Sequence, residues 1–593
     1  MNVLPAFYKD RTGVYTEQVR RLQAKGSLIS FLRLISFIGW ALCVYFLFKE
    51  YTTSVLVLGL AIFACYILLV AWAFRLKDRR ALLEKLLFIN TNEAGVLEHA
   101  LNGFPDGQAF LSSESYFDDL DIFGKRSLFH VLNRTTTSHG TEQLAALLRQ
   151  PFSSKAAIEE TQQAIRVLAE QVDKRQLLTA RGLFKEEKEG YLYSVLDWLQ
   201  APTRLLSKKW VLALRWIIVL YNCAALVVLV DSGNYRFLLI GVLAGWILTA
   251  FFGGYISEQH VLLGRKHAVL DQYLSILRVF NTMEAGNAPH LQQLQARTGK
   301  AHGAIKRLAT LSNFFDQSLN PTVSFILNNL FLYNLQCMIA LEKWKITNKT
   351  EFPGWIHAVG SIECLNSLAA FAFNNPANTY PIPVESKCLF IEAAQMAHPL
   401  IPASERVPND FVAGKTDRLL LVTGSNMSGK TTFLRTAGVN LLLAQCGAPV
   451  CATAFSFTPM QILTSLRVSD SLQEHTSYFM AELKKLQQII HRLQSGVPAL
   501  VLIDEILRGT NSEDKTYGSE QFIRKLLQYN CLSLFATHDL SLGKLEAEKP
   551  DEIRNYCFES VIEQGELHFN YQLQRGIAMN RNASFLMKKM EII

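Results

Sequence analysis

The sequence has no two cysteines in a C-x-x-C spacing and no cysteine and histidine cluster with the spacing of metal ligands. Its ten cysteines are scattered, which disfavours a disulfide scaffold and a structural zinc site and fits a reducing compartment best. Charged residues make up only 19% of the chain, while half of its residues are hydrophobic. That composition is too apolar for a disordered chain and too charged for a protein lying wholly within a membrane, so it favours a mixture of membrane and soluble parts.

Acidic residues are outnumbered by basic ones, 51 against 59, which gives a formal charge of +8. This excess suits nucleic acid or anionic lipid as a partner but identifies neither. At roughly 150 residues per domain, the 593 residues correspond to about four domains, so a single small module is excluded.

Long apolar runs are confined to two pairs of segments, 34–48 with 55–74 and 210–230 with 237–256. Three of the four approach the roughly 20 apolar residues that cross a bilayer, and the shortest gains length if Arg33 reaches the interface. Because only six residues join the members of each pair, each pair is predicted to form a transmembrane hairpin. The alternative is a set of buried helices in a large soluble core, but such helices are usually shorter and rarely come as pairs with basic flanks.

Basic residues flank both predicted hairpins. They are Lys9, Arg11, Arg20, Arg21, Lys25, Arg75, Lys77, Arg79 and Arg80 around the first, and Arg204, Lys208 and Lys209 before the second. The connectors carry only Lys49 and Arg236. Since Lys and Arg near the ends of spans mark the cytoplasmic side, we expect a multi-pass protein of the cell inner membrane with its soluble domains in the cytoplasm. A second span follows the first at once, with no small-residue cleavage site, so the first is not a signal peptide.

The remaining chain divides into helical and α/β regions. Residues 81–207 and 258–385 have apolar residues three and four apart, which predicts helices. The expected organisation is an N-terminal segment with the first hairpin (1–80), a helical region in two parts (81–207 and 258–385) on either side of the second hairpin (208–257), and a C-terminal domain (386–593). In the second helical part Arg297, Lys300, Lys306 and Arg307 could touch phosphate, although a solvated helix face is the simpler interpretation.

A glycine-rich loop follows the strand-like run 419–422. It reads Gly424-Ser425-Asn426-Met427-Ser428-Gly429-Lys430-Thr431-Thr432 and contains a complete Walker A pattern, G-x-x-x-x-G-K-[ST]. The backbone N–H groups of such a loop surround phosphates, and the start of the following helix adds its positive end. Lys430 would reach the terminal phosphates and Thr431 would offer its hydroxyl to Mg²⁺. A merely structural turn is disfavoured because a strand and a helical stretch flank the loop, so the sequence predicts a site for ATP and Mg²⁺.

Two further apolar runs end in polar residues. The run 500–503 is followed by Asp504 and Glu505, and the run 532–535 leads to His538. Open α/β sheets bind ligands at the carboxyl ends of their strands. We therefore predict that Asp504 holds the Mg²⁺ shell, that Glu505 orients or deprotonates the attacking water, and that His538 senses the terminal phosphate. A lone histidine is usually structural, so the last assignment depends on its place in this series.

These motifs together resemble the ATPase domain of the MutS family of DNA mismatch-repair proteins. The resemblance is carried by residues 423–432, 504–511 and 535–538, and by 398–400, 408–410 and 576–579. Asn426-Met427 inside the loop distinguishes it from generic phosphate-loop proteins, and residues 125–135 resemble the start of the family's helical core domain. The resemblance implies a multidomain α and α/β fold, in which a helical core and lever region precedes a C-terminal ATPase domain of the ABC type.

The resemblance also implies a homodimer. In this family two ATPase domains pair head to tail, and a signature serine of each completes the site of the other. Residues 474–482 match that signature, which makes Ser477 the candidate, although His475 stands where the mismatch-repair members commonly have glycine. The simpler alternative for Ser477 is a polar residue at the start of a helix.

Departures from the family leave the partner open. The N-terminal domain that reads mismatches with a Phe-x-Glu wedge is replaced here by a predicted membrane hairpin, and the tripeptides at 48–50, 184–186 and 390–392 match only by chance composition. The protein is therefore expected to be a membrane-anchored ATPase that binds mismatched, branched or otherwise irregular DNA. The alternative is a membrane-bound switch that acts on a protein partner without recognising DNA. A transporter is a distant third, because two short hairpins offer few polar groups for a pathway.

Overall fold

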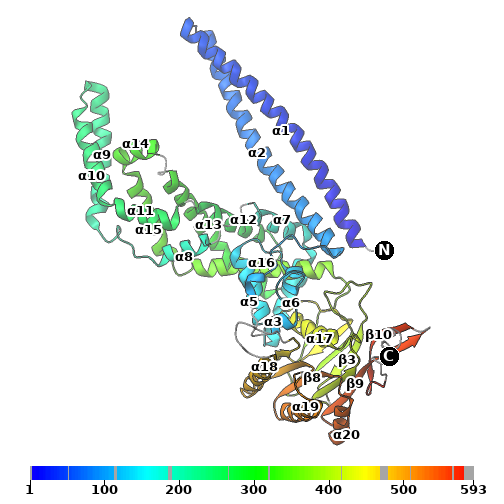
Figure 1. The fold of residues 1–593 in the computed structure, drawn as a ribbon. Helices are drawn as coiled ribbons and strands as arrows, with labels where there is room; N and C mark the ends of the chain where they lie inside the picture. Colours follow the sequence, from blue (N-terminus) through cyan, green and yellow to red (C-terminus); the bar gives the residue numbers. More distant parts are fainter. Residues whose placement is uncertain are drawn as a thin grey trace.

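The computed structural model describes residues 3–50, 52–111, 116–184, 190–264, 266–317, 321–415, 417–467, 478–507, 509–563 and 566–579. In these residues the chain forms a helical body that carries two helical arms on one side and an α/β domain on the other (Figure 1). The arms point away from the α/β domain, which lies at the opposite end of the molecule (Figure 1).

The first arm is a hairpin of two very long helices, α1 (Val3–Lys49) and α2 (Thr53–Leu97). Aromatic rings hold them together, with Trp40 of α1 5.3 Å from Phe63 of α2 between ring centroids. Both helices extend well beyond the apolar runs, because polar helical sequence continues each of them toward the body. The helix α2 thus continues beyond the apolar run 55–74 as far as Leu97.

The second arm contains α9 (Lys209–Ser232) and α10 (Arg236–Phe251), with the shorter α14 (Pro321–Phe331) beside them (Figure 1). The run 237–256, which the sequence predicts as one span, is divided at Phe252. There the chain bends by 60° into α11 (Gly253–Leu263).

Among the described residues four helices are long and apolar enough to cross a membrane, namely α1, α2, α9 and α16, or five when the bent pair of α10 and α11 counts as one span. Burial separates them. Only 6% of the most apolar window of α1 and of α2 is buried within the protein, against 78% for α16. The helix α16 (Phe352–Asn374) is therefore a core helix, whereas α1 and α2 expose apolar side chains along their length.

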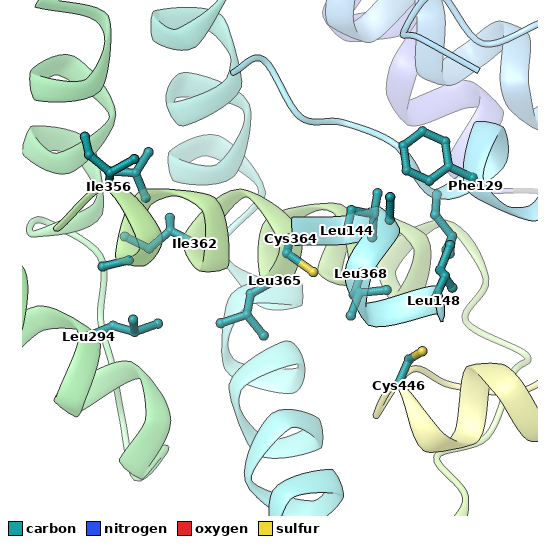
Figure 2. Packing of buried hydrophobic residues seen from close by; sticks show 14 of the residues in the cluster. Phe129, Leu144, Leu148, Leu294, Ile356, Ile362, Cys364, Leu365, Leu368 and Cys446 are labelled. Atoms are coloured by element: carbon teal, nitrogen blue, oxygen red, sulfur yellow. The ribbon is translucent and has the colours of Figure 1, made fainter. Parts of the chain in front are cut away.

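The helical body surrounds α16. Its other elements are η1 (Gln108–Phe110), α3 (Tyr116–Asp119), α4 (Leu128–Leu132), α5 (Ser138–Arg149), α6 (Lys155–Glu170), α7 (Val172–Gly182), α8 (Tyr191–Gln200), α12 (His267–Phe280), α13 (Pro289–Gln317) and α15 (Tyr333–Asn348). Leu365 and Leu368 of α16 pack beside Leu144 of α5, and Leu148 lies near Cys446 from the α/β domain (Figure 2). One apolar core thus runs from the body into the α/β domain.

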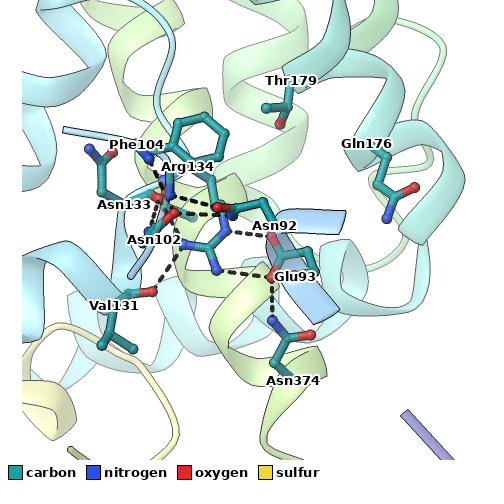
Figure 3. A network of polar contacts seen from close by, with 12 residues as sticks. Asn92, Glu93, Asn102, Phe104, Val131, Asn133, Arg134, Gln176, Thr179 and Asn374 are labelled. Carbon is teal, nitrogen blue, oxygen red and sulfur yellow. Dashed lines mark hydrogen bonds and ion pairs between the residues drawn. The ribbon is translucent and has the colours of Figure 1, made fainter. Parts of the chain in front are cut away.

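A buried polar network fixes the base of the first arm to the body (Figure 3). Arg134 pairs with Glu93 of α2 through Nη2 and Oε2 at 2.9 Å and through a second, shorter contact. Asn374, the last residue of α16, donates to Glu93 at 2.6 Å and accepts from the Tyr8 hydroxyl of α1 at 2.7 Å. Because a buried charged pair is stable only when its members are fully satisfied, α1, α2 and α16 are held as one unit.

The α/β domain contains two sheets. The four-stranded sheet has the order β1-β5-β2-β3, with β1 (Ile382–Pro383), β2 (Ile391–Met396), β3 (Asn409–Ala413) and β5 (Ala454–Phe457). The six-stranded sheet has the order β10-β9-β4-β8-β7-β6, with β4 (Leu419–Gly424), β6 (Gln461–Ser465), β7 (Ala499–Asp504), β8 (Cys531–Thr537), β9 (Ile553–Glu563) and β10 (Glu566–Arg575). Its helices are α17 (Lys430–Gln445), α18 (Tyr478–Leu493), α19 (Ser512–Leu526) and α20 (Leu545–Glu548), with η2 (Leu540–Lys544).

The three strands predicted from apolar runs are present as β4, β7 and β8, and they are parallel neighbours in the larger sheet. Parallel strands end at the same edge, so the polar residues that follow these three strands meet there.

Candidate nucleotide site

The glycine-rich loop connects the last residue of β4, Gly424, to the first residue of α17, Lys430. Gly429 has φ of 106°, and a Cβ added there would lie 3.1 Å from the ring of Tyr571. Met427 has φ of 65° and is 85% exposed. A non-glycine residue in this left-handed region costs of order 1–3 kcal/mol, and such strain gathers at ligand-binding sites.

Two side chains of the loop turn inward. The Lys430 ammonium donates to the carbonyl oxygens of Gly424 and Ser425, both at 2.9 Å, and the residue is only 5% exposed. The Ser428 hydroxyl oxygen is buried and has no hydrogen-bond partner among the described residues. A buried polar atom left unpaired costs about 1–3 kcal/mol, so this hydroxyl is suited to pair with a bound ligand.

Thr431 and Asp504 form an oxygen pair where the loop meets the end of β7. The Thr431 hydroxyl donates to Oδ2 of Asp504 at 2.5 Å, and Asp504 is 8% exposed. Hydroxyl and carboxylate oxygens are the donors that Mg²⁺ prefers beside phosphate oxygens, so the residues present fit that ion.

Glu505 and His538 form a second pair, with Nε2 of His538 2.6 Å from Oε1 of Glu505. Burial lowers the pKa of His538 below its usual value, and the positive charge of Lys430 lowers it further. The lowered pKa favours the uncharged imidazole. Nε2 of His538 also lies 3.4 Å from the Lys430 ammonium, so this ring nitrogen contacts both the carboxylate and the lysine. Glu505 itself has φ of 44°, a second strained position at this sheet edge.

One cavity of about 760 Å³ joins these groups, a volume typical of small-molecule sites. It is lined by Met427, Ser428, Gly429, Lys430, Thr431, Asp504, Glu505, His538 and Tyr571. Its apolar side is lined by Ile401, Val407, Phe433, Phe558 and Tyr571. Sequence reasoning missed these residues, because no motif spacing marks them. It quoted His398 only as part of a family motif. His398 also lines the cavity, and burial lowers its pKa to about 4, so it is uncharged.

The loop after β7 is tied to α18, since the backbone N–H of Leu507 donates to Oε1 of Glu482 at 2.9 Å. Glu482 is 1% exposed and lies in the first turns of α18, which begins at Tyr478. Sequence reasoning gave Glu482 no role. Ser477, the predicted signature residue, lies outside the described residues.

A mainly parallel α/β domain with a glycine-rich loop between a strand and a helix belongs to the class of nucleotide-binding domains. Residues 420–590 match the family model of MutS domain V. This match confirms the resemblance to the MutS family in the C-terminal part of the chain, where that family has its ATPase domain.

Proposed function

We propose that the protein is a membrane-anchored, MutS-like ATPase that hydrolyses ATP in the cavity of the α/β domain and couples turnover to movement of the helical body. The observation that carries this proposal is the meeting of Lys430, Thr431, Asp504, Glu505 and His538 around one cavity. They come from three strand ends that are far apart in the sequence.

Each of these residues has a role in the proposal. Lys430 neutralises the terminal phosphates, and the backbone from Gly424 to Thr432 surrounds them. Thr431 and Asp504 hold Mg²⁺, which when bound neutralises developing charge on the phosphate oxygens. Glu505 accepts a proton from the attacking water, while His538, whose Nε2 lies 2.6 Å from Oε1 of Glu505, keeps the carboxylate in place. The apolar side of the cavity takes the base of the nucleotide.

The helix α17 is the proposed link between the cavity and the body. It begins at the loop, and at its other end Sγ of Cys446 lies 3.7 Å from the Leu147 carbonyl oxygen of α5. The N–H of Phe152, in the segment after α5, donates to the Gln445 carbonyl at 3.2 Å. Arg435, one turn beyond the loop, pairs with Asp121 of the body at 2.9 Å. A shift of the loop on nucleotide binding would therefore displace α5, and through α16 the base of the first arm.

The family's head-to-tail pairing is part of the proposal, with Ser477 of each chain completing the site of a second copy. So is the organisation into an N-terminal hairpin, a helical body interrupted by a second hairpin, and an ATPase domain from about residue 386. Membrane anchoring is supported by the exposed apolar faces of α1, α2, α9 and α10 and by the basic residues at the body-side ends of α1, α2 and α9.

Cysteine labelling tests the topology. In a background that lacks the exposed Cys65 and Cys223, Asn234→Cys in the second connector should react with a membrane-impermeant maleimide in intact cells. The native, exposed Cys388 of the α/β domain should react only after permeabilisation. Labelling of Cys388 in intact cells would contradict the orientation, and a protein that stays in solution after lysis without detergent would contradict the anchoring.

DNA is the partner that family membership favours, and α13 offers the cations for it. Arg297, Lys300, Lys306 and Arg307 are all exposed on this helix. A switch that acts on a protein partner is the second candidate, favoured because a predicted membrane hairpin stands where the family has its mismatch-reading domain.

Salt titration separates the two candidates. If α13 contacts phosphates, binding to branched or mismatched DNA should weaken steeply with salt, and Arg307→Ala should lower the slope of log K against log salt by about 1. Lys415→Ala, which removes an exposed cation of the α/β domain, should leave the slope unchanged. Absence of binding to any of these DNAs at low salt would favour the protein partner.

A further inference from the structure

The short helix α14 docks on the second arm through a single polar side chain. Asn222 of α9 is fully buried, and its Nδ2 donates to the carbonyl oxygens of Asn329 at 3.2 Å and Leu330 at 2.9 Å. These carbonyls belong to the last turn of α14, where no helical partner remains for them. The one buried asparagine of an otherwise apolar stretch of α9 thus caps the end of α14.

The helix α10 supplies a surface of small residues for the same contact. Gly241 and Gly245 form a G-x-x-x-G pattern, the spacing that brings helices close together in membranes. A Cβ at Gly241 would lie 1.8 Å from Oδ1 of Asn222, and one at Gly245 would lie 2.7 Å from the carbonyl oxygen of Asn329. Both glycines are therefore required for α9, α10 and α14 to meet.

This contact lies halfway along the arm. Asn222 comes thirteen residues after Lys209, the first residue of α9, which places it about 20 Å from the base at 1.5 Å per residue. The hydrocarbon core of a bilayer is about 30 Å thick. If the arm crosses a bilayer, the end of α14 lies deep within it, beside α10 (Figure 1).

The composition around α14 fits that depth. No Asp, Glu, Lys or Arg occurs from residue 317 to residue 341. The side chains of Phe325 and Ile326 are 70% and 51% exposed, although the helix packs on the arm with its other side. Exposed aromatic and aliphatic groups of this size are favourable against lipid and unfavourable against water.

Hydrogen bonds within the chain cross the break between α14 and α15, which favours its placement in hydrocarbon. Leu332 interrupts the helix with φ of 51°, and its N–H donates to the Asn328 carbonyl at 3.0 Å. The Asn328 side chain accepts from the N–H of Asn334 at 2.8 Å. The side chains of Asn222 and Asn328 thus bond backbone groups on the two sides of this break.

We propose that α14 is a re-entrant helix that enters the lipid beside the second hairpin and returns to the same side through α15. The inference rests on the proposed membrane anchoring and adds a third contact with lipid. Because α13 and α15 flank it, α14 attaches the helical body directly to the bilayer. Movement of the body during turnover would then move an element within the membrane.

Spin labels on three isoleucines of matched exposure test this inference in the full-length protein in lipid nanodiscs. Ile240 of α10 is 57% exposed, Ile326 of α14 is 51% exposed and Ile382 of β1 is 60% exposed. Each is replaced by Cys in a background where Cys65, Cys223 and Cys388 are Ala. The measured quantity is the ratio of collision rates with oxygen, which enters lipid, and with a water-soluble nickel complex.

The ratio at Ile326→Cys should equal that at Ile240→Cys and exceed that at Ile382→Cys several-fold. If the label at position 326 gives the same ratio as the label at 382 while the label at 240 reports lipid, the placement of α14 in the membrane is wrong but the anchoring by the second hairpin stands. If 240 also reports water, the membrane anchoring itself is wrong.

A glycine variant tests the docking. Gly245→Ala should release α14 and make the label at 326 more mobile and several-fold more accessible to nickel. Gly39→Ala in the first arm is the control, because a Cβ there has only ordinary contacts, the nearest at 3.7 Å. A label at 326 that is unaffected by Gly245→Ala would show that α14 does not depend on this contact.

Discussion

Replacing Lys430 with alanine should abolish ATP turnover and weaken nucleotide binding while leaving the fold intact. The side chain is buried beneath the loop, and its ammonium donates to two backbone carbonyls of the loop, which places its positive charge where the phosphates would lie. Removing a group that stabilises transition-state charge typically costs about 10² to 10³ in rate. Phosphate release and binding of a fluorescent nucleotide measure the two effects separately.

Lys415→Ala is the matched control. Lys415 is an exposed lysine of the same domain that pairs with Glu392 at 2.6 Å, and its loss should leave turnover unchanged. Hydrolysis near the wild-type rate by a folded Lys430→Ala protein would exclude the loop as the catalytic site.

Much of this site is predictable because its polar residues lie in short sequence motifs. The loop, the pair Asp504-Glu505 and His538 each follow a short apolar run, and parallel strands bring such positions to one edge. The contact of His538 with Glu505 joins residues far apart in the sequence, and so does the contact of Glu482 with Leu507, so neither could be predicted from a motif. The apolar side of the cavity was missed because Phe433, Phe558 and Tyr571 come from three separate elements.

The arms show what hydropathy detects and what it misses. Hydropathy locates the apolar runs of α1 and α2 but not their polar continuations, which are helical because they pack on the body through residues such as Tyr8 and Glu93. Hydropathy did not predict the bend at Phe252, and no proline in α10 or α11 marks its position. The apolar run in α14 was not predicted as a membrane segment, because it is short and its two asparagines lower its mean hydropathy.

Replacing Glu505 with glutamine should separate ATP binding from hydrolysis. Glutamine has the size and shape of glutamate, so the contact with His538 is kept while the base is removed. Hydrolysis should fall by about 10² or more, the usual scale for a lost general base, and ATP should still bind. Glu392→Gln on β2 is the control and should hydrolyse normally.

ATP that is bound but not hydrolysed should hold two ATPase domains together. Glu505→Gln with ATP and Mg²⁺ should therefore show more crosslinked dimer in detergent than the wild-type protein does, and adding Ser477→Arg should reverse the gain, because the arginine would obstruct the partner's site. Normal turnover by Glu505→Gln would place the base elsewhere. A variant that stalls without ATP-dependent association would instead show that the head-to-tail pairing implied by the family does not hold for this chain, since trapped nucleotide would then have no second domain to bind.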